Sequence, residues 1–158
     1  MLYRRLGRSG LKVSALGFGA GDAFGTTVGR GAARCWVSQA YDAGINLFDG
    51  GEGRADGEAE RIIGDVLADL RLPRETLVVS CRMFPNPAQP SAPIQDGLSR
   101  KRVREACDAA LKRLRVDYLD LFVAHPLDAW TPVEETVWAM DQLVRAGKVL
   151  YWGSCEWP

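Results

Sequence analysis

The spacing of apolar residues alternates between two patterns along most of this chain, and each pattern predicts one kind of secondary-structure element. Short, nearly continuous apolar runs predict buried strands, whereas apolar residues three and four positions apart predict helices. The predicted strands are residues 13–19, 45–49, 76–82, 118–124 and 149–153. The predicted helices are residues 32–43, ending at Gly44, residues 58–70, a segment capped by Ser99, and a segment that begins at Thr131-Pro132 and ends at Gly147.

The first residues follow a different pattern from the rest. Residues 2–14 alternate around the turn residues Ser9 and Gly10, which predicts a β-hairpin. From residue 15 onwards strand and helix alternate, which is typical of a parallel sheet covered by helices. We therefore expect residues 1–158 to form a single partial domain, with a hairpin at 2–14 and βα units over 15–158.

Two architectures share this alternation, a doubly wound sheet and a (β/α)8 barrel. A dinucleotide-binding doubly wound sheet needs G-x-G-x-x-G after its first strand, but here Gly17 and Gly19 are followed by Asp22 in place of the third glycine. The strands also end in residues suited to a shared site, namely Asp49, Arg82, His125 and Ser154. We predict an α/β fold, a truncated (β/α)8 TIM-type barrel with about five parallel strands and an N-terminal β-hairpin.

Composition narrows the classes of function. The chain is 47% hydrophobic and 25% charged, with 20 basic and 20 acidic residues, so its net charge is zero. This balance argues against nucleic-acid binding. No apolar run approaches the roughly 20 residues that cross a bilayer, which argues against membrane insertion. The first residues also lack the apolar core of a signal peptide, so we expect a cytoplasmic protein.

The cysteines and the single histidine give little support for a metal site. Cys35, Cys81, Cys107 and Cys155 are widely spaced and form no C-x-x-C pair, and His125 is the one histidine. By spacing alone we expect no bound metal and no structural disulfide, only reduced thiols.

Five segments resemble one enzyme family. They are LYRRLGRSGLKVS (2–14), AGINLFD (43–49), GLSRK (97–101), LRVDYLD (114–120) and YWGS (151–154). These segments are similar to the N-terminal half of the aldo-keto reductases, especially the branch that contains potassium-channel β-subunits. The resemblance implies a barrel related to NADP-dependent oxidoreductases, which reduce small carbonyl compounds with hydride from NADPH.

The resemblance also implies the site residues. The family uses an aspartate, a tyrosine five positions later, a lysine and a histidine, and the matching positions are Asp49, Arg54, Arg82 and His125. The implied cofactor-binding positions are Ala20, Gly21, Asp49, Ser154, Cys155 and Glu156. Two of the four catalytic residues are replaced by arginine. Glu156 stands where the family branch has an arginine that contacts NADP(H).

The replacements predict impaired catalysis. A carbonyl that accepts hydride must also receive a proton, and losing the general acid costs about 10²–10⁴ in rate. Arg54 can stabilise an oxyanion, but a guanidinium has a very high pKa and hardly releases a proton. Arg82 can still pair with Asp49 across the strand ends. We also expect the last strands of the family barrel, which grip the cofactor's adenosine, to be missing.

Structural interpretations of the same residues stay open at this stage. Asp49 can serve as an ion-pair partner or helix cap, His125 as a satisfied core histidine, and Arg54 as a solvated charge. Tyr151 and Trp152 are consistent with packing as well as with a substrate wall.

Three hypotheses of function follow from this sequence. The chain is a working reductase, a non-catalytic fragment or regulatory module, or a half barrel. The half barrel would be completed by a homo-oligomer or by a separate complementing half. The strand at 149–153 would present an unprotected sheet edge, which favours the second and third hypotheses.

Overall fold

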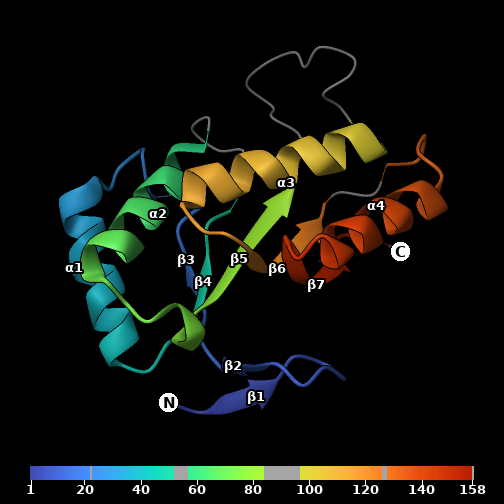
Figure 1. The fold of residues 1–158 in the computed structure, drawn as a ribbon. Helices are drawn as coiled ribbons and strands as arrows, with labels where there is room; N and C mark the ends of the chain where they lie inside the picture. Colours follow the sequence, from blue (N-terminus) through green and yellow to red (C-terminus); the bar gives the residue numbers. More distant parts are fainter. Residues whose placement is uncertain (22, 52–56, 84–96, 126–127, 158) are drawn as a thin grey trace.

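The computed structural model describes residues 1–21, 23–51, 57–83, 97–125 and 128–157. Its strands are β1 (Tyr3–Arg5), β2 (Lys12–Ser14), β3 (Phe18–Gly19), β4 (Leu47–Asp49), β5 (Val78–Met83), β6 (Leu119–Ala124) and β7 (Val149–Ser154). Its helices are α1 (Arg30–Asp42), α2 (Glu58–Leu70), α3 (Arg100–Leu114) and α4 (Val133–Arg145), with a 3-10 turn at Arg74–Thr76. Figure 1 shows how these elements are arranged.

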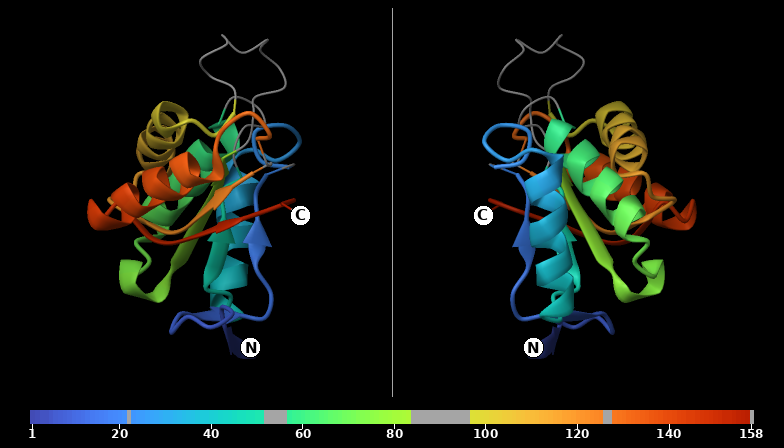
Figure 2. Two further views of the ribbon diagram at one scale, coloured as in Figure 1. Left: turned by 90° about the vertical axis from the view of Figure 1, so that its right-hand side faces the viewer. Right: turned by 90° about the vertical axis from the view of Figure 1, so that its left-hand side faces the viewer.

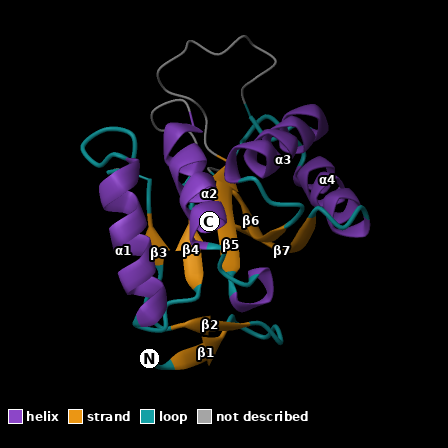
Figure 3. Cartoon of the chain, turned by 60° about the vertical axis from the view of Figure 1, so that its left-hand side comes forward, coloured by secondary structure: helices purple, strands orange, loops and turns teal. Residues whose placement is uncertain are grey.

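One parallel sheet organises the described residues, with its strands side by side in the order β3-β4-β5-β6-β7. The helices α1 to α4 form an arc outside this sheet (Figure 3). A doubly wound sheet would reverse its strand order and place helices on both faces. The unreversed order and the outer arc of helices confirm the predicted truncated (β/α)8-type barrel.

The hairpin β1–β2 lies at the amino ends of the parallel strands, beside the N-terminus (Figure 1). Its strands pair antiparallel, with Arg4 opposite Val13. Asn46, just before β4, fixes it there: its Oδ1 accepts from the Ser14 amide at 2.7 Å, and its Nδ2 donates to the Lys12 carbonyl at 3.2 Å. The hairpin thus lies at the end of the sheet opposite to the carboxyl ends of the strands.

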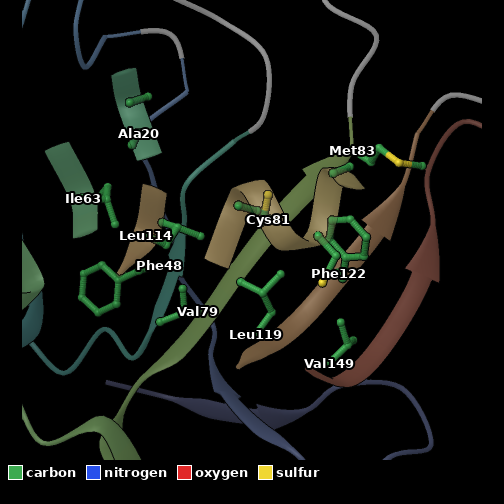
Figure 4. Packing of buried hydrophobic residues seen from close by; sticks show 14 of the residues in the cluster. Ala20, Phe48, Ile63, Val79, Cys81, Met83, Leu114, Leu119, Phe122 and Val149 are labelled. Atoms are coloured by element: carbon green, nitrogen blue, oxygen red, sulfur yellow. The ribbon is translucent and has the colours of Figure 1, made fainter. Parts of the chain in front are cut away.

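The main apolar core lies between the sheet and the helices (Figure 4). Phe48, Val79 and Phe122 from the strands pack with Ile63 of α2 and Leu114 of α3, and all five are almost fully buried. Burying each large apolar side chain contributes about 1.5–3 kcal/mol, so this layer supplies much of the stability of the fold.

A charged group lies inside this core. The side chain of Glu60, on α2, is fully buried. Its Oε1 accepts a hydrogen bond from the Cys81 thiol at 2.9 Å, and its Oε2 accepts from Arg113 Nε of α3. The carboxylate therefore joins β5, α2 and α3, and its burial is possible because both oxygens have donors.

The other face of the sheet is less covered. Strand register places Ser80, Leu121 and Tyr151 in one row, with Asp49 opposite Ser80 on β4. Leu121 and Tyr151 are only half-buried. In the full barrel architecture this row would face the interior, which is filled by side chains from all strands.

Two sequence predictions were wrong in detail. The strand predicted at 13–19 is divided: Lys12–Ser14 belong to the hairpin, and β3 is only Phe18–Gly19. The chain turns between them, and the Ser14 hydroxyl donates to the Leu16 carbonyl at 2.6 Å. The helix predicted to begin at Thr131-Pro132 begins at Val133 instead: Pro132 occupies the N-cap, and the Thr131 hydroxyl donates to Asp128.

Other predictions about the ends of helices were confirmed. Helix α2 spans Glu58–Leu70, the range predicted from its apolar face. The Ser99 hydroxyl accepts from the Arg102 amide at 3.3 Å and caps α3. Gly147 follows α4 with a φ of +71°, a left-handed conformation that glycine adopts without strain.

Candidate functional site

The carboxyl ends of the parallel strands form one edge of the sheet, where barrel enzymes place their active sites. Asp49 ends β4, Arg82 lies near the end of β5, His125 follows β6, and Ser154 ends β7. The fold therefore brings these sequence-predicted residues to the same edge. They form two clusters, one on β4 and β5 and one on β6 and β7.

The first cluster is centred on the Asp49 carboxylate. Its Oδ2 lies 3.0 Å from Arg82 Nη2, which is the ion pair predicted from the sequence. Its Oδ1 accepts from the Ser80 hydroxyl at 3.0 Å and from the Gly51 amide at 3.2 Å. The side chains of Asp49 and Arg82 are 25% and 46% exposed, so solvent reaches the pair.

The ends of β3 and β4 approach each other closely beside Asp49. The Ala20 amide donates to the Asp49 carbonyl at 3.0 Å, and the Ala20 side chain is fully buried. A Cβ at Gly51, which has a φ of +58°, would lie 3.0 Å from the Gly21 Cα. Glycine at 51 thus permits the contact, while the predicted cofactor roles of Ala20 and Gly21 stay predictions.

The second cluster joins the ends of β6 and β7. The ladder continues past both strands, because the Cys155 amide donates to the Ala124 carbonyl at 3.0 Å. His125 Nδ1 lies 3.4 Å from the Cys155 carbonyl oxygen, and His125 Nε2 lies 3.9 Å from Glu156 Oε2. The His125 side chain is 7% exposed and that of Glu156 is 72% exposed, so the cluster runs from the interior to solvent.

Arg54, the residue at the family's tyrosine position, lies outside the described residues, and its role stays a prediction. Ser80 was missed by sequence reasoning. Strand alternation puts Ser80 and Arg82 on one face of β5, but only the register, with Ser80 opposite Asp49, shows their contact. The grouping of His125 with Cys155 and Glu156 was also missed, because 30 positions separate His125 from Cys155 in the chain.

Asp128 is a further residue that the sequence analysis did not single out. Its Oδ2 accepts from the Leu98 amide at 3.0 Å, its Oδ1 accepts from the Trp130 amide at 2.9 Å, and the Thr131 hydroxyl also donates to it. Burial alone would raise the pKa of Asp128, but these hydrogen bonds, led by that of Thr131, outweigh it and hold the pKa below its ordinary value. The carboxylate thereby ties the start of α3 to the start of α4.

A surface pocket of about 260 Å³ lies away from this edge, between α3 and α4. Arg100, Arg104 and Lys148 contribute to its lining. Lys148 directly precedes β7, so the pocket adjoins the amino end of that strand. We place the candidate site at the carboxyl edge instead, because the predicted chemical groups meet there.

Comparison with known proteins agrees with this geometry. The model of the family described as "Aldo/keto reductase family" matches residues 15–158. Two curated relatives are described as "Probable voltage-gated potassium channel subunit beta". The one from Oryza sativa subsp. japonica is 43% identical and the one from Arabidopsis thaliana is 42% identical, each over 99% of this chain. This chain covers 47% of each relative, so it spans about half of their length. With the family model matching nearly the whole chain, the protein belongs to the aldo/keto reductase family.

Proposed function

We propose that this chain forms the first half of a barrel related to NADP(H)-dependent carbonyl oxidoreductases, with an impaired catalytic site. The observation that carries the proposal is the Asp49–Arg82 ion pair at the strand ends. Within the family this edge reduces carbonyl groups, and here a guanidinium takes the place of the lysine ammonium.

Proton supply is the step that we expect to fail. The oxygen of a carbonyl that accepts hydride becomes an alkoxide and needs a proton donor. A guanidinium is a poor proton donor, and the charge of Arg82 is already matched by Asp49. Arg54 at the tyrosine position is also a guanidinium, so no general acid replaces the phenol. The expected loss in rate is about 10²–10⁴.

The residues at the end of β7 do not fit a phosphate-bearing cofactor held in the family's manner. Glu156 places an exposed carboxylate where the family branch has an arginine, and like charges repel. Ser154 offers a hydroxyl donor, but a single neutral donor does not offset this charge reversal. We therefore derive no hydride step and expect only weak binding of NADP(H).

Fluorescence titration with NADPH tests this proposal, alongside turnover of an aromatic aldehyde. We expect no saturation at micromolar NADPH in the wild type, and tighter binding in Glu156→Arg, because the reversed charge is restored. The double variant Arg54→Tyr with Arg82→Lys tests proton supply separately. Micromolar binding together with steady turnover by the wild type would overturn the proposal.

Completion of the barrel is the second part of the proposal. Large apolar side chains are exposed at both ends of the arc: Trp36 on α1, and Val137 and Trp138 on α4. Leu150 of β7, at the sheet edge, is exposed too. Such a distribution fits surfaces that further βα units of the same architecture would cover. We propose a complementing half barrel as the partner.

The mass of the particle in solution tests this idea. If separate polypeptides with the family's C-terminal half complete the barrel, mixing them with this chain gives a 1:1 complex in light scattering. Trp138→Lys should weaken that complex, while Trp130→Lys, in an exposed loop residue outside α4, should not. A stable homodimer, or no association at all, would contradict the complementing half barrel.

A regulatory module is the alternative function. The two relatives are described as probable channel subunits, and exposed apolar helix surfaces suit protein contacts. No described helix has the length and apolarity to span a membrane. All four cysteines are free thiols, which is typical of a reducing compartment, and we infer a cytoplasmic location. Stable co-purification with a channel's cytoplasmic region, without reductase turnover, would favour this alternative.

A further inference from the structure

Three different metal-ligating side chains meet at the ends of β6 and β7. One ligand atom each from His125, Cys155 and Glu156 lies within 4.8 Å of the other two. Figure 1 shows β6 and β7 side by side, and the ladder that joins them continues to Cys155. Parallel pairing brings His125 level with Cys155, and the left-handed backbone at Glu156, with a φ of +58°, follows directly.

We propose that His125, Cys155 and Glu156 bind a Zn²⁺ ion. Thiolate, imidazole and carboxylate are the three ligand types that Zn²⁺ takes in proteins, whereas Mg²⁺ and Ca²⁺ select oxygen ligands alone. A thiolate and a carboxylate together also balance the charge of the ion. The site uses the catalytic position His125 and the cofactor-binding positions Cys155 and Glu156 that the resemblance implies, but Zn²⁺ binding can be measured without NADP(H) and without reductase turnover.

The contacts of His125 assign its ring nitrogens. A backbone carbonyl only accepts hydrogen bonds, so the approach of Nδ1 to the Cys155 carbonyl at 3.4 Å requires a proton on Nδ1. In the neutral ring Nε2 then keeps its lone pair, and Nε2 is the atom beside Glu156. Metal-binding histidines commonly donate their second ring N–H to a carbonyl in this way.

The distances between the ligand atoms fit tetrahedral coordination of Zn²⁺ after small movements of the side chains. Zn–N bonds of about 2.0–2.1 Å and Zn–S bonds of about 2.3 Å put neighbouring ligand atoms roughly 3.3–3.8 Å apart. His125 Nε2 and Glu156 Oε2 are 3.9 Å apart. The exposed Glu156 side chain can rotate to close the remaining gap, and it gives the ion a path from solvent. Three protein ligands leave the fourth position to water.

Binding of Zn²⁺ to the whole chain tests the proposal, after treatment with a chelator and its removal. We expect one Zn²⁺ per chain by calorimetry, and a Co²⁺ form with a thiolate charge-transfer band. Cys155→Ser should remove that band and weaken Zn²⁺ binding by at least the 10–100-fold or so that loss of a supporting ligand contact costs. Cys35→Ser is the matched control, because Cys35 is an exposed thiol on α1 and should leave both signals unchanged.

A second readout separates ligation from folding. Zn²⁺ should raise the melting temperature of the wild type and of Cys35→Ser, but not that of Cys155→Ser, because only a bound ion stabilises the folded state. Glu156→Gln, at an exposed position, should keep the fold and weaken binding less than Cys155→Ser. Absence of stoichiometric binding, or binding that survives Cys155→Ser, would overturn the proposal.

Discussion

Two arginine–carboxylate pairs in this protein have similar chemistry but opposite surroundings. Glu60 of α2 and Arg113 of α3 form an ion pair in which the glutamate side chain is fully buried and also accepts a hydrogen bond from Cys81. Asp49 and Arg82 pair at the carboxyl edge of the sheet, where solvent reaches both side chains. The same kind of ion pair is therefore found in the buried core in one place and at the solvent-exposed edge of the sheet in the other.

The degree of burial determines how much each ion pair contributes to the stability of the folded protein. Breaking a buried pair leaves an uncompensated charge in the interior and costs about 3–5 kcal/mol. An exposed pair contributes about 0–1 kcal/mol, because water solvates either partner once the other is lost. The Asp49–Arg82 pair thus adds little to stability, and its position at the strand ends agrees with the ligand site that we propose there.

The largest expected effect comes from neutralising the buried pair. Glu60→Gln keeps the shape of the side chain but removes the buried charge that pairs with Arg113 Nε, and we expect a loss of about 3–5 kcal/mol in the free energy of unfolding. Urea denaturation measures it. Glu58→Gln, two residues earlier on α2 with Arg61 as its exposed partner, should change the value by less than about 1 kcal/mol. Equal effects of the two substitutions would remove the distinction between core and surface.

The fold was largely predictable from sequence, for reasons visible in single elements. The apolar face of α2 fixes its period over 13 residues, so its range was predicted correctly. β3 was overestimated because Val13, which is buried and pairs with Arg4 in the hairpin, was assigned to the next strand. A local apolar pattern identifies a strand without stating its partner.

The candidate site was predictable only in part. The pairing of Asp49 with Arg82 followed from strand ends that meet at one edge. Ser80 and the grouping of His125 with Cys155 depend on register between strands, which the pattern of one sequence does not encode. Arg113, the partner of the buried Glu60, is 53 positions away and was missed because the packing of α3 on α2 brings the two side chains together.

Packing of α2 on α3 gives the second prediction about the covered layer. A Cβ at Gly64 would lie 2.6 Å from the backbone carbonyl of Leu114, so Gly64→Ala must force the helices apart. We expect a loss of about 1–3 kcal/mol. Gly31→Ala in α1 is the matched control, since its Cβ meets nothing within 4 Å and should stabilise by about 0.4–1 kcal/mol. Thermal unfolding of both variants measures the contrast, and a stable Gly64→Ala would contradict close packing here.

The pH dependence of stability provides a third test of the covered layer. Burial raises the pKa of the Cys107 thiol to about 11, the nearby Asp108 adds to the rise, and Lys148 partly opposes it. A raised pKa means that the folded state holds the proton more tightly, so this stability is complete below about pH 9 and is lost between about 9 and 11. The loss is up to roughly 3 kcal/mol. Urea midpoints across this range should fall more steeply in the wild type than in Cys107→Ala, and parallel curves would refute the assignment.

The smallest expected effect lies at the open edge. Asp49→Asn removes the charge that faces Arg82 but keeps the Oδ1 acceptor for Ser80 and Gly51. Arg82 is half-exposed and becomes hydrated, so we expect a change of about 0–1 kcal/mol by urea denaturation. Glu60→Gln is the matched change from carboxylate to amide in the core. If Asp49→Asn destabilised the protein as strongly as Glu60→Gln, the edge pair would be a structural element of the fold, and the ligand site proposed there would lose its main support.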